Sequence, residues 1–415
     1  MKKEEYQHWP IYGEEKGPLK LGVAPEFGGR IIRLALDGYD FLFANQNLAG
    51  QDNIQPTAAY KGIWQNFGGD KVWPAPQGWA NNEQWPGPPD PVLDGGVYAM
   101  QELQEGSILL TSPVDNFTGL QIRRQIRLCP DQCGVDINVF FQNTGKDNRR
   151  WSIWPVIQMN TSEEEEGVYR VTIPVKADSL YPQGFKVMHG LVNNPQFYRD
   201  GDHAVVDYKY LIGKIGCDSD TGWVACCNTR NGKVLVAEFT PGVDGLYPDN
   251  TSVQIWTQGR GMFYSRGNIR MLPDDRQTNP AYLEIELLSP FGQMAPGAEM
   301  QYNYRMRTCT IPAGGDVRNI KGYVAVSQPL KAEWWDQKIY ISASYGFFTE
   351  GTLCLKDARN GTQIGGSWQV GPCRGLEVET ILTEREALGI DTLILEFTTN
   401  QKKNFIIERI ELCRI

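Results

Sequence analysis

A chain of 415 residues is too long for one ordinary hydrophobic core, so two domains are the natural expectation. It carries 40 Lys and Arg against 49 Asp and Glu, and no basic stripe, which excludes nucleic acid and an anionic membrane surface as expected partners. Its 44 Gly and 25 Pro are spread along the chain, which is typical of many short strands joined by turns.

The sequence shows no long apolar run, so no membrane-spanning segment is expected. Its first residues also lack the apolar stretch of a signal peptide, so no signal peptide is expected. The alternative is a leader that has already been removed. The nine cysteines show no metal-binding spacing. Buried thiols are typical of reducing compartments, so we expect a cytoplasmic protein, with a disulfide between Cys129 and Cys133 as an open alternative.

The first chemically unusual segment covers residues 66–98, which are rich in Trp, Gly and Pro. Loops of this length in compact domains are usually functional. One interpretation is a structural cover over one end of a β-sandwich. The other is a sugar-binding rim, in which Lys71 donates hydrogen bonds to hydroxyls and Trp73, Trp79 and Trp85 offer flat aromatic surfaces.

Strand periodicity is clear at residues 120–128, where aliphatic and polar residues alternate. A turn and a second alternating stretch at residues 135–141 follow, so this segment predicts a β-hairpin. Arg124 falls on the apolar face, and an arginine is almost never buried without a partner. It forms either a salt bridge inside the sandwich, with Glu238 as a candidate, or a donor to a ligand in a groove.

Further strands are predicted at residues 233–239, 252–257 and 281–290, whereas helical patterns are scarce and residues 382–388 are the best candidate. Many short strands favour an all-β sandwich. A boundary near residue 312 divides a large antiparallel sandwich, residues 1–312, from a small one, residues 317–415. The last strand of the small sandwich resembles the closing strand of jelly-roll carbohydrate-binding modules.

The strand at residues 281–290 places two carboxylates on one face. Aliphatic residues at alternating positions mark the core face, so Glu284 and Glu286 point the other way, about 7 Å apart along the strand. That face either meets solvent or lines a groove in which a carboxylate can accept a hydroxyl proton.

Several motifs resemble the galactose mutarotase superfamily. Residues 28–34, Gly-Gly-Arg-Ile-Ile-Arg-Leu, resemble the opening strand of aldose 1-epimerases, and residues 283–290 followed by Pro296-Gly297 are similar to their late core strand. Residues 68–76 and the turn at 181–184 look more like an uncharacterised branch, the DUF4380-type proteins. The order of the motifs matches over about residues 18–310, which implies the mutarotase-like supersandwich fold.

The resemblance implies that Glu284 is the general base that removes the anomeric hydroxyl proton. The facing acid of that family is a histidine, but residues 151–159, the corresponding segment, contain none. Gln158 takes its place, and an amide cannot donate a proton near neutral pH. His189 or His203 from a loop is the alternative acid, and weak or no turnover of simple aldoses is expected.

We therefore expect a carbohydrate-binding protein for a small sugar or an oligosaccharide, with a sugar epimerase or mutarotase using Glu284 as the alternative. A glycoside hydrolase or lyase, in which Glu284 acts with Asp70 or Asp94, is the second alternative. Three histidines without a ligand spacing and no phosphate-binding loop predict neither metal nor cofactor. The predicted ligand contacts besides Glu284 are Asp70, Lys71, Trp73, Trp85, Arg124, Gln158 and Glu286.

Overall fold

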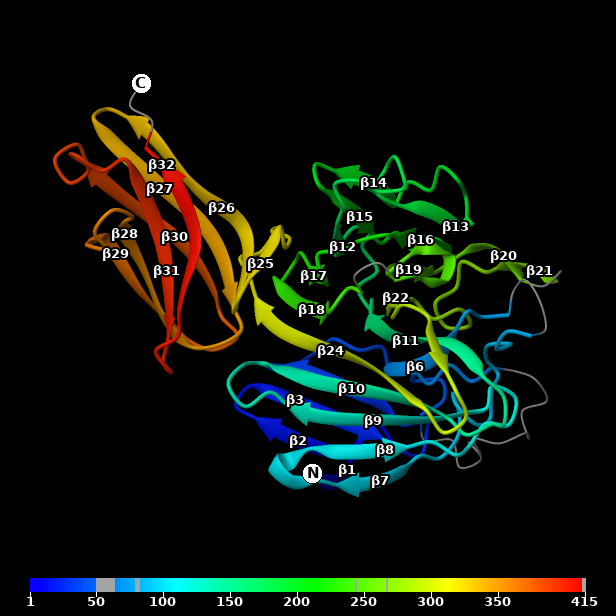
Figure 1. The fold of residues 1–415 in the computed structure, drawn as a ribbon. Coiled ribbons are helices and arrows are strands. Elements are labelled where there is room, and N and C mark those ends of the chain that lie inside the picture. The colour runs from blue at the N-terminus through cyan, green and yellow to red at the C-terminus, as the bar shows by residue number, and fades with distance from the viewer. Residues whose placement is uncertain (50–63, 79–82, 243–244, 266–267, 413–415) are drawn as a thin grey trace. The chain divides into compact units, whose positions relative to one another are not determined.

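The computed structural model describes residues 1–49, 64–78, 83–242, 245–265 and 268–412 (Figure 1). These residues form strands β1 to β32 and two short 3-10 helices, η2 (Gln104–Gly106) and η3 (Pro248–Asn250). The expected all-β fold is therefore confirmed. Within this part of the chain, no helix has the length and apolarity needed to cross a membrane.

The chain divides into two compact units. The first comprises Met1–Leu128, Val135–Val224 and Ala237–Met306. The second comprises Cys129–Gly134, Ala225–Val236 and Arg307–Ile415, so it takes two short pieces from the tips of earlier hairpins as well as the C-terminal stretch.

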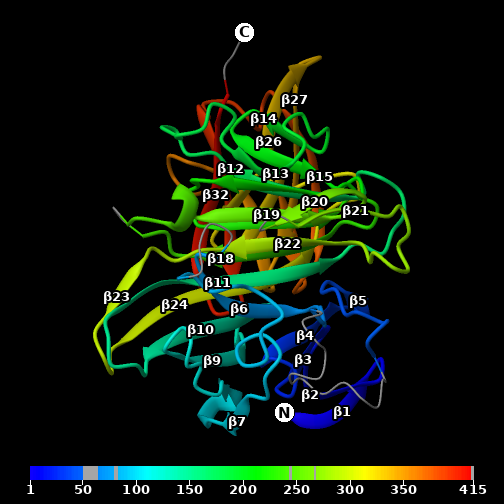
Figure 2. The ribbon, with the colours of Figure 1, turned by 90° about the vertical axis from the view of Figure 1, so that its right-hand side faces the viewer.

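The chain contains two large antiparallel sheets, which supply most of the first unit (Figure 2). The larger sheet has the order β1-β2-β3-β4-β6-β11-β22-β19-β16-β13, with β5 paired to β4 and β23 to β11. Its strands are β1 (Lys2–Tyr6), β2 (Trp9–Lys16), β3 (Leu19–Ala24), β4 (Arg30–Leu36), β5 (Tyr39–Asp40), β6 (Asp70–Ala75), β11 (Arg149–Asn160), β13 (Lys186–Gly190), β16 (Gly213–Cys217), β19 (Val253–Gln258), β22 (Tyr282–Leu287) and β23 (Gly292–Met294).

The second sheet has the order β14-β15-β12-β17-β18-β24-β10-β9-β8-β7. Its strands are β7 (Ala99–Glu102), β8 (Ile108–Thr111), β9 (Leu120–Leu128), β10 (Gly134–Asn143), β12 (Tyr169–Pro174), β14 (Phe197–Asp200), β15 (His203–Asp207), β17 (Trp223–Asn228), β18 (Lys233–Phe239) and β24 (Glu299–Thr310). A separate hairpin is formed by β20 (Gly261–Ser265) and β21 (Asn268–Leu272).

The predicted hairpin is the pair β9 and β10. Leu128 lies opposite Val135 and Leu120 opposite Asn143, with antiparallel pairing throughout. Buried and half-buried residues alternate along β9, as expected for a strand with one face on the core.

A buried ion pair links the two sheets. Arg124 on β9 is paired with Asp70 on β6, and both side chains are fully buried. Tyr304 on β24 donates a hydrogen bond of 2.8 Å to the Asp70 carboxylate, and Arg124 donates one of 2.7 Å to the carbonyl of Gly29. The partner of Arg124 is thus Asp70 and not Glu238, and the structural interpretation of this arginine fits the geometry.

The second unit contains two four-stranded sheets of its own. One has the order β25-β26-β27-β30 and the other β29-β28-β31-β32. The strands are β25 (Asn319–Lys321), β26 (Val324–Trp335), β27 (Lys338–Phe347), β28 (Gly351–Asp357), β29 (Gln363–Val370), β30 (Gly375–Thr383), β31 (Thr392–Thr399) and β32 (Asn404–Glu411). Buried aliphatic and aromatic residues from both sheets, among them Tyr345, Leu353 and Phe397, form their shared core.

The expected helix at residues 382–388 is absent. Strand β30 continues to Thr383, and a turn follows it. The Glu386 carboxylate accepts hydrogen bonds from the backbone N–H of Thr383 at 2.8 Å and from its hydroxyl at 2.7 Å. These contacts resemble a helix cap, but Gly389 has a φ of +80° and the chain leaves the helical conformation.

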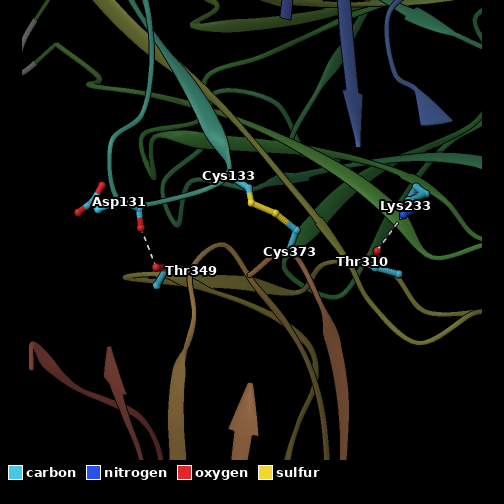
Figure 3. The surroundings of a disulfide bond; sticks show 6 residues. All are labelled: Asp131, Cys133, Lys233, Thr310, Thr349 and Cys373. Carbon is cyan, nitrogen blue, oxygen red and sulfur yellow. Dashed lines mark hydrogen bonds between the residues drawn. A yellow bond between two sulfur atoms is a disulfide. The ribbon is translucent and has the colours of Figure 1, made fainter. Parts of the chain in front are cut away.

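The second unit contains a disulfide between Cys133 and Cys373, whose Cα atoms lie 6.1 Å apart (Figure 3). Cys129 is a free, buried thiol, so the alternative of a Cys129–Cys133 bond is wrong. The backbone at and before Cys133 is held as well: the Cys133 N–H donates to the carbonyl of Phe348 at 2.7 Å, and the Thr349 hydroxyl donates to the carbonyl of Asp131 at 2.7 Å. Sequence spacing gave no hint of this pair, because the partners are 240 residues apart.

Alkylation under denaturing conditions is expected to reveal this bond. Without reductant Cys133 and Cys373 stay unmodified, and after reduction both are labelled, because only a free thiol reacts. Peptide mass spectrometry locates the labels, and Cys129 serves as the internal control because its thiol is free in the fold. Labelling of Cys373 without prior reduction would contradict the pairing.

Candidate functional site

One face of the larger sheet carries mostly polar and aromatic side chains, with Val156 as an aliphatic residue among them. Glu284 lies opposite Gln158 on β11 and opposite Trp256 on β19, and residues opposite one another in a sheet point to the same face. Following the register across six strands defines the polar face: Lys71, Trp73, Trp154, Gln158, Glu284, Glu286, Gln254, Trp256, Lys214 and His189. The opposite face carries Ile153, Ile157, Leu283, Ile285 and Leu287, which are fully buried.

Glu284 lies at the centre of the polar face between an amide and an ammonium group. Gln158 donates a hydrogen bond of 2.7 Å to Oε1 of Glu284, and the Lys71 Nζ lies 3.6 Å from the same oxygen. Burial lowers the pKa of Lys71 to about 8, although the nearby Glu284 carboxylate acts in the opposite direction. Among the described residues the Lys71 ammonium has no hydrogen-bond acceptor.

Glu286, two residues along β22, has its own cation. Lys214 and the indole N–H of Trp154 donate to Oε2 of Glu286 at 2.8 and 2.9 Å. Burial raises the pKa of Glu286, and Lys214 counteracts part of that effect. The Lys214 Nζ also lies 5.0 Å from the centre of the Trp154 ring. The polar face therefore holds two carboxylate–lysine pairs side by side.

An aromatic cluster surrounds Lys71. Its Nζ lies 4.7 Å from the ring centre of Trp73 and 6.0 Å from that of Trp64. The Asp94 carboxylate accepts hydrogen bonds from the indole N–H groups of Trp73 at 3.0 Å and of Trp64 at 2.9 Å. It also forms an ion pair of 3.0 Å with the buried Arg30. Asp94 thus fixes the two indole rings beside Lys71.

The predicted aromatic rim is largely buried. Trp85 is fully buried, packs 5.3 Å from Trp73 and donates its indole N–H to Asp90 at 2.6 Å. Trp73 is buried as well and packs edge-on against Trp154 at 5.4 Å. Trp79 lies outside the described residues.

A cavity of about 240 Å³ opens beside the Glu286 pair. Its lining includes Gln77, Gln84, Trp154, His189, Lys214 and Gln254. The His189 ring stacks on Tyr264 with 4.1 Å between ring centres, and burial lowers the pKa of His189 to about 4, so this ring is neutral at pH 7. Lys214 and Trp154, the two hydrogen-bond donors to Glu286, line the cavity. Lys71 and Glu284 lie beside them on the polar face.

The structure brings together only part of the predicted site. Lys71, Gln158, Glu284 and Glu286 share the polar face, and Trp73 lies on the same face two residues along β6 from Lys71. Asp70 and Arg124 do not belong to it, because Asp70 is on the core side of β6 and pairs with Arg124 inside the sandwich. These two residues are therefore withdrawn as ligand contacts.

Sequence reasoning missed Trp154, Lys214 and Gln254 and placed His189 in a loop. His189 lies on β13, and its bulged pairing with β16 places it opposite Lys214. Each residue lies on a readable strand, but the strand order β6-β11-β22-β19-β16-β13 is what gathers them, and no local pattern encodes that order. In the described part of the chain, no cluster of three His, Cys, Asp or Glu residues suited to a metal ion is present.

Fold and site together define an all-β protein with an enclosed polar and aromatic face on the larger of its sheets. The family model for a domain of unknown function, DUF4380, matches residues 14–308. The chain belongs to this family, as the sequence motifs indicated.

Solved structures similar to this chain include several described as mutarotase-like. A galactose mutarotase-like protein from Lactobacillus casei shares 10% identity over 72% of this chain and 99% of its own, with a TM-score of 0.47. One from Clostridium acetobutylicum shares 10% over 74% and 98%, with a TM-score of 0.45, and an aldose epimerase homologue from C. elegans shares 11% over 72% and 98%, with a TM-score of 0.44. These likenesses concern the fold, and no argument about activity rests on them. Among the curated proteins, none matches this chain.

Proposed function

We propose that this chain binds a carbohydrate at the polar face, in the cavity beside Glu286. The observation that carries the proposal is the lining of this cavity, which combines the Trp154 ring, three amides and the Lys214 ammonium. A sugar ring presents hydroxyl groups around its edge and C–H groups on its faces. Such a ligand needs hydrogen-bonding groups and a flat apolar surface together.

The size of the cavity favours a small ligand. Pockets for drug-sized molecules have volumes of roughly 300–1,000 Å³, and this cavity of about 240 Å³ is slightly smaller. A monosaccharide, or the terminal residue of an oligosaccharide, is therefore the proposed ligand.

The glycoside hydrolase or lyase alternative finds no support in the geometry. Asp70 is paired with Arg124 on the other side of the sheet, and Asp94 is occupied by Arg30, Trp64 and Trp73. Neither carboxylate stands across a cleft from Glu284, as a paired mechanism requires.

The cytoplasmic location expected from the sequence stays a prediction. The Cys133–Cys373 bond weighs against it, because disulfides form and persist mainly in oxidising compartments. Alkylation of intact source cells, followed by lysis and fractionation, would decide between the two environments.

Replacement of Trp154 by Ala is expected to weaken sugar binding by about 1 kcal/mol or more, on the scale of aromatic contacts. The change removes the flat surface that lines the cavity and the indole donor to Glu286. Titration calorimetry with D-glucose, D-galactose, L-rhamnose, L-fucose and D-galacturonate measures the effect. Trp154→Phe separates the loss of the donor from the loss of the ring.

The matched control is Trp335→Ala, since Trp335 is 71% exposed and belongs to the second unit. This control is expected to bind as the unmodified protein does. An unmodified protein that binds none of the five sugars, or a Trp154→Ala variant that binds them equally well, would reject the proposed site.

A further inference from the structure

We propose that the ligand of the cavity beside Glu286 is an amphipathic glycoside, whose sugar ring enters the cavity and whose apolar aglycone lies on the exposed face of the β20–β21 hairpin. The inference rests on the proposed sugar-binding function and adds the chemical class of the ligand to it. Four residues make up this exposed face, the hairpin patch: Met262, Tyr264, Ile269 and Met271.

The hairpin patch is an apolar surface in contact with water. Met262 lies opposite Met271, and Tyr264 lies opposite Ile269. Side chains of opposite residues point to one face, and so do those of residues two apart on a strand, so all four project together. Ile269 and Met271 are 71% and 72% exposed, and Met262 is 48% exposed. Single exposed apolar residues are ordinary, but a contiguous group of them marks a binding surface.

The inner face of the hairpin holds it against the larger sheet, beyond the end of β19 (Figures 1 and 2). The Phe263 ring lies 6.3 Å from the ring of Trp256 and 5.6 Å from that of His189, measured between centres. Leu272 packs with Phe263 against a buried cluster that includes Trp256. The hairpin is therefore fixed by its inner face, and the patch on its outer face is not needed to hold it in place.

His189 connects the hairpin patch with the cavity. Its ring lines the cavity and stacks on Tyr264, with 4.1 Å between ring centres and 20° between the planes. The ring is neutral at pH 7, so it places no charge between the cavity and the patch. A single imidazole ring separates the two surfaces, and a ligand held in the cavity therefore reaches the patch with a short substituent.

The cavity and the patch divide the chemistry of an amphipathic ligand between them. Three amides and the Lys214 ammonium line the cavity and can bind hydroxyl groups, but its volume of about 240 Å³ is small for a sugar ring together with a long apolar group. The apolar group must then lie outside. Met262 and Met271 suit such a group, because methionine side chains are unbranched and adapt to ligands of different shape.

The extent of the patch argues against a protein as its partner. Four partly exposed side chains offer at most a few hundred Å², whereas a stable protein interface takes roughly 800 Å² from each partner. A second copy of this chain is disfavoured on the same ground. A short alkyl or aryl group, tethered by a sugar in the neighbouring cavity, needs no more area than the patch provides.

The test is titration calorimetry with the methyl and octyl glycosides of D-glucose, D-galactose, L-rhamnose and L-fucose, in both anomeric forms and below the concentrations at which micelles form. For at least one of these sugars the octyl glycoside is expected to bind about 10- to 100-fold more tightly than the methyl glycoside. This is the gain expected when an alkyl chain loses roughly half of its contact with water.

The double variant Ile269→Ser with Met271→Ser locates the gain. It removes the two most exposed side chains of the patch and leaves the inner face of the hairpin unchanged. The advantage of the octyl chain is expected to fall to about threefold or less, while the affinity for the methyl glycoside stays the same and shows that the cavity is intact. Leu388→Ser is the control, because Leu388 is 69% exposed and belongs to the second unit, and it should keep the full gain.

The failures of the two proposals are distinguishable. Free sugars or methyl glycosides that bind without any gain from the octyl chain overturn the amphipathic ligand and leave the proposed sugar-binding function intact. A gain that survives in the double variant overturns the hairpin patch as the place of the aglycone. Absence of binding by every glycoside and by the five free sugars overturns the proposed function and this inference with it.

Two further measurements address other occupants of the patch. Sedimentation with phosphatidylcholine vesicles detects a lipid surface, and sedimentation velocity detects a second copy of the chain. Either association, lost in the double variant and accompanied by no gain from the octyl chain, would assign the patch to that occupant and overturn the proposal.

Discussion

If the chain interconverts anomers, as the family resemblance implies, replacement of Glu284 by Gln is expected to slow that exchange by about 100- to 10,000-fold, the usual range for the loss of a general base. Glutamine keeps the size and the hydrogen-bonding capacity of the side chain but cannot accept the hydroxyl proton. Because the ligand cavity lies beside Glu286, binding of the sugar should change far less than the rate. Exchange NMR gives the rate, and calorimetry on the same sample gives the affinity.

Glu286→Gln is the matched comparison, because the two carboxylates are two residues apart on one face of β22. The Glu286 carboxylate accepts hydrogen bonds from Lys214 and Trp154, and both residues line the cavity. Replacement of Glu286 is therefore expected to weaken sugar binding more than it slows anomer exchange. If Glu286→Gln abolished exchange and Glu284→Gln retained it, the base would be Glu286 and the assignment made here would be wrong.

The two pairs also explain why one strand carries two carboxylates. Each is held by a different lysine, from β6 for Glu284 and from β16 for Glu286, on opposite sides of β22. Like charges at this spacing repel, and the neighbouring Glu284 contributes to the raised pKa of Glu286. Two flanking lysines therefore stabilise a doubly charged strand face.

The part of this site that is encoded locally could be predicted from the sequence. Alternation at residues 281–290 is enough to place Glu284 and Glu286 together, because the side-chain period of a strand is two. The hairpin of β9 and β10 follows in the same way from its alternation and its turn. Neighbours on different strands cannot be predicted in this way. Lys214 and Glu286 are 72 residues apart in the sequence and meet because β16 and β22 lie on either side of β19.

Asp70 shows why a local motif can mislead. It stands next to Lys71 in a segment rich in Gly, Trp and Pro, which made both residues candidates for one rim. Adjacent residues of a strand face opposite sides, so Lys71 enters the polar face and Asp70 enters the core. That segment becomes strand β6, and recognising a strand there requires its partner β11, which lies far along the chain.

Replacement of Arg124 by Met is expected to lower the free energy of unfolding by about 3–5 kcal/mol, the usual range for removing one partner of a buried ion pair. Asp70 would then remain as a charge without its counterion between two sheets. The hydrogen bond from Arg124 to the Gly29 carbonyl would be lost too, which leaves a buried acceptor. Chemical denaturation followed by tryptophan fluorescence measures the change.

The double variant Arg124→Met with Asp70→Asn identifies the cause. Removing the second charge should restore much of the lost stability, because the penalty comes from the uncompensated carboxylate and not from the missing cation. Arg123→Met is the control on the same strand: Arg123 pairs with Glu299 and is 34% exposed, so its loss should cost under about 1 kcal/mol. Equal losses for Arg123 and Arg124 would show that burial gives the Arg124–Asp70 pair no special weight, and no recovery in the double variant would show that the uncompensated charge of Asp70 is not the cause of the loss.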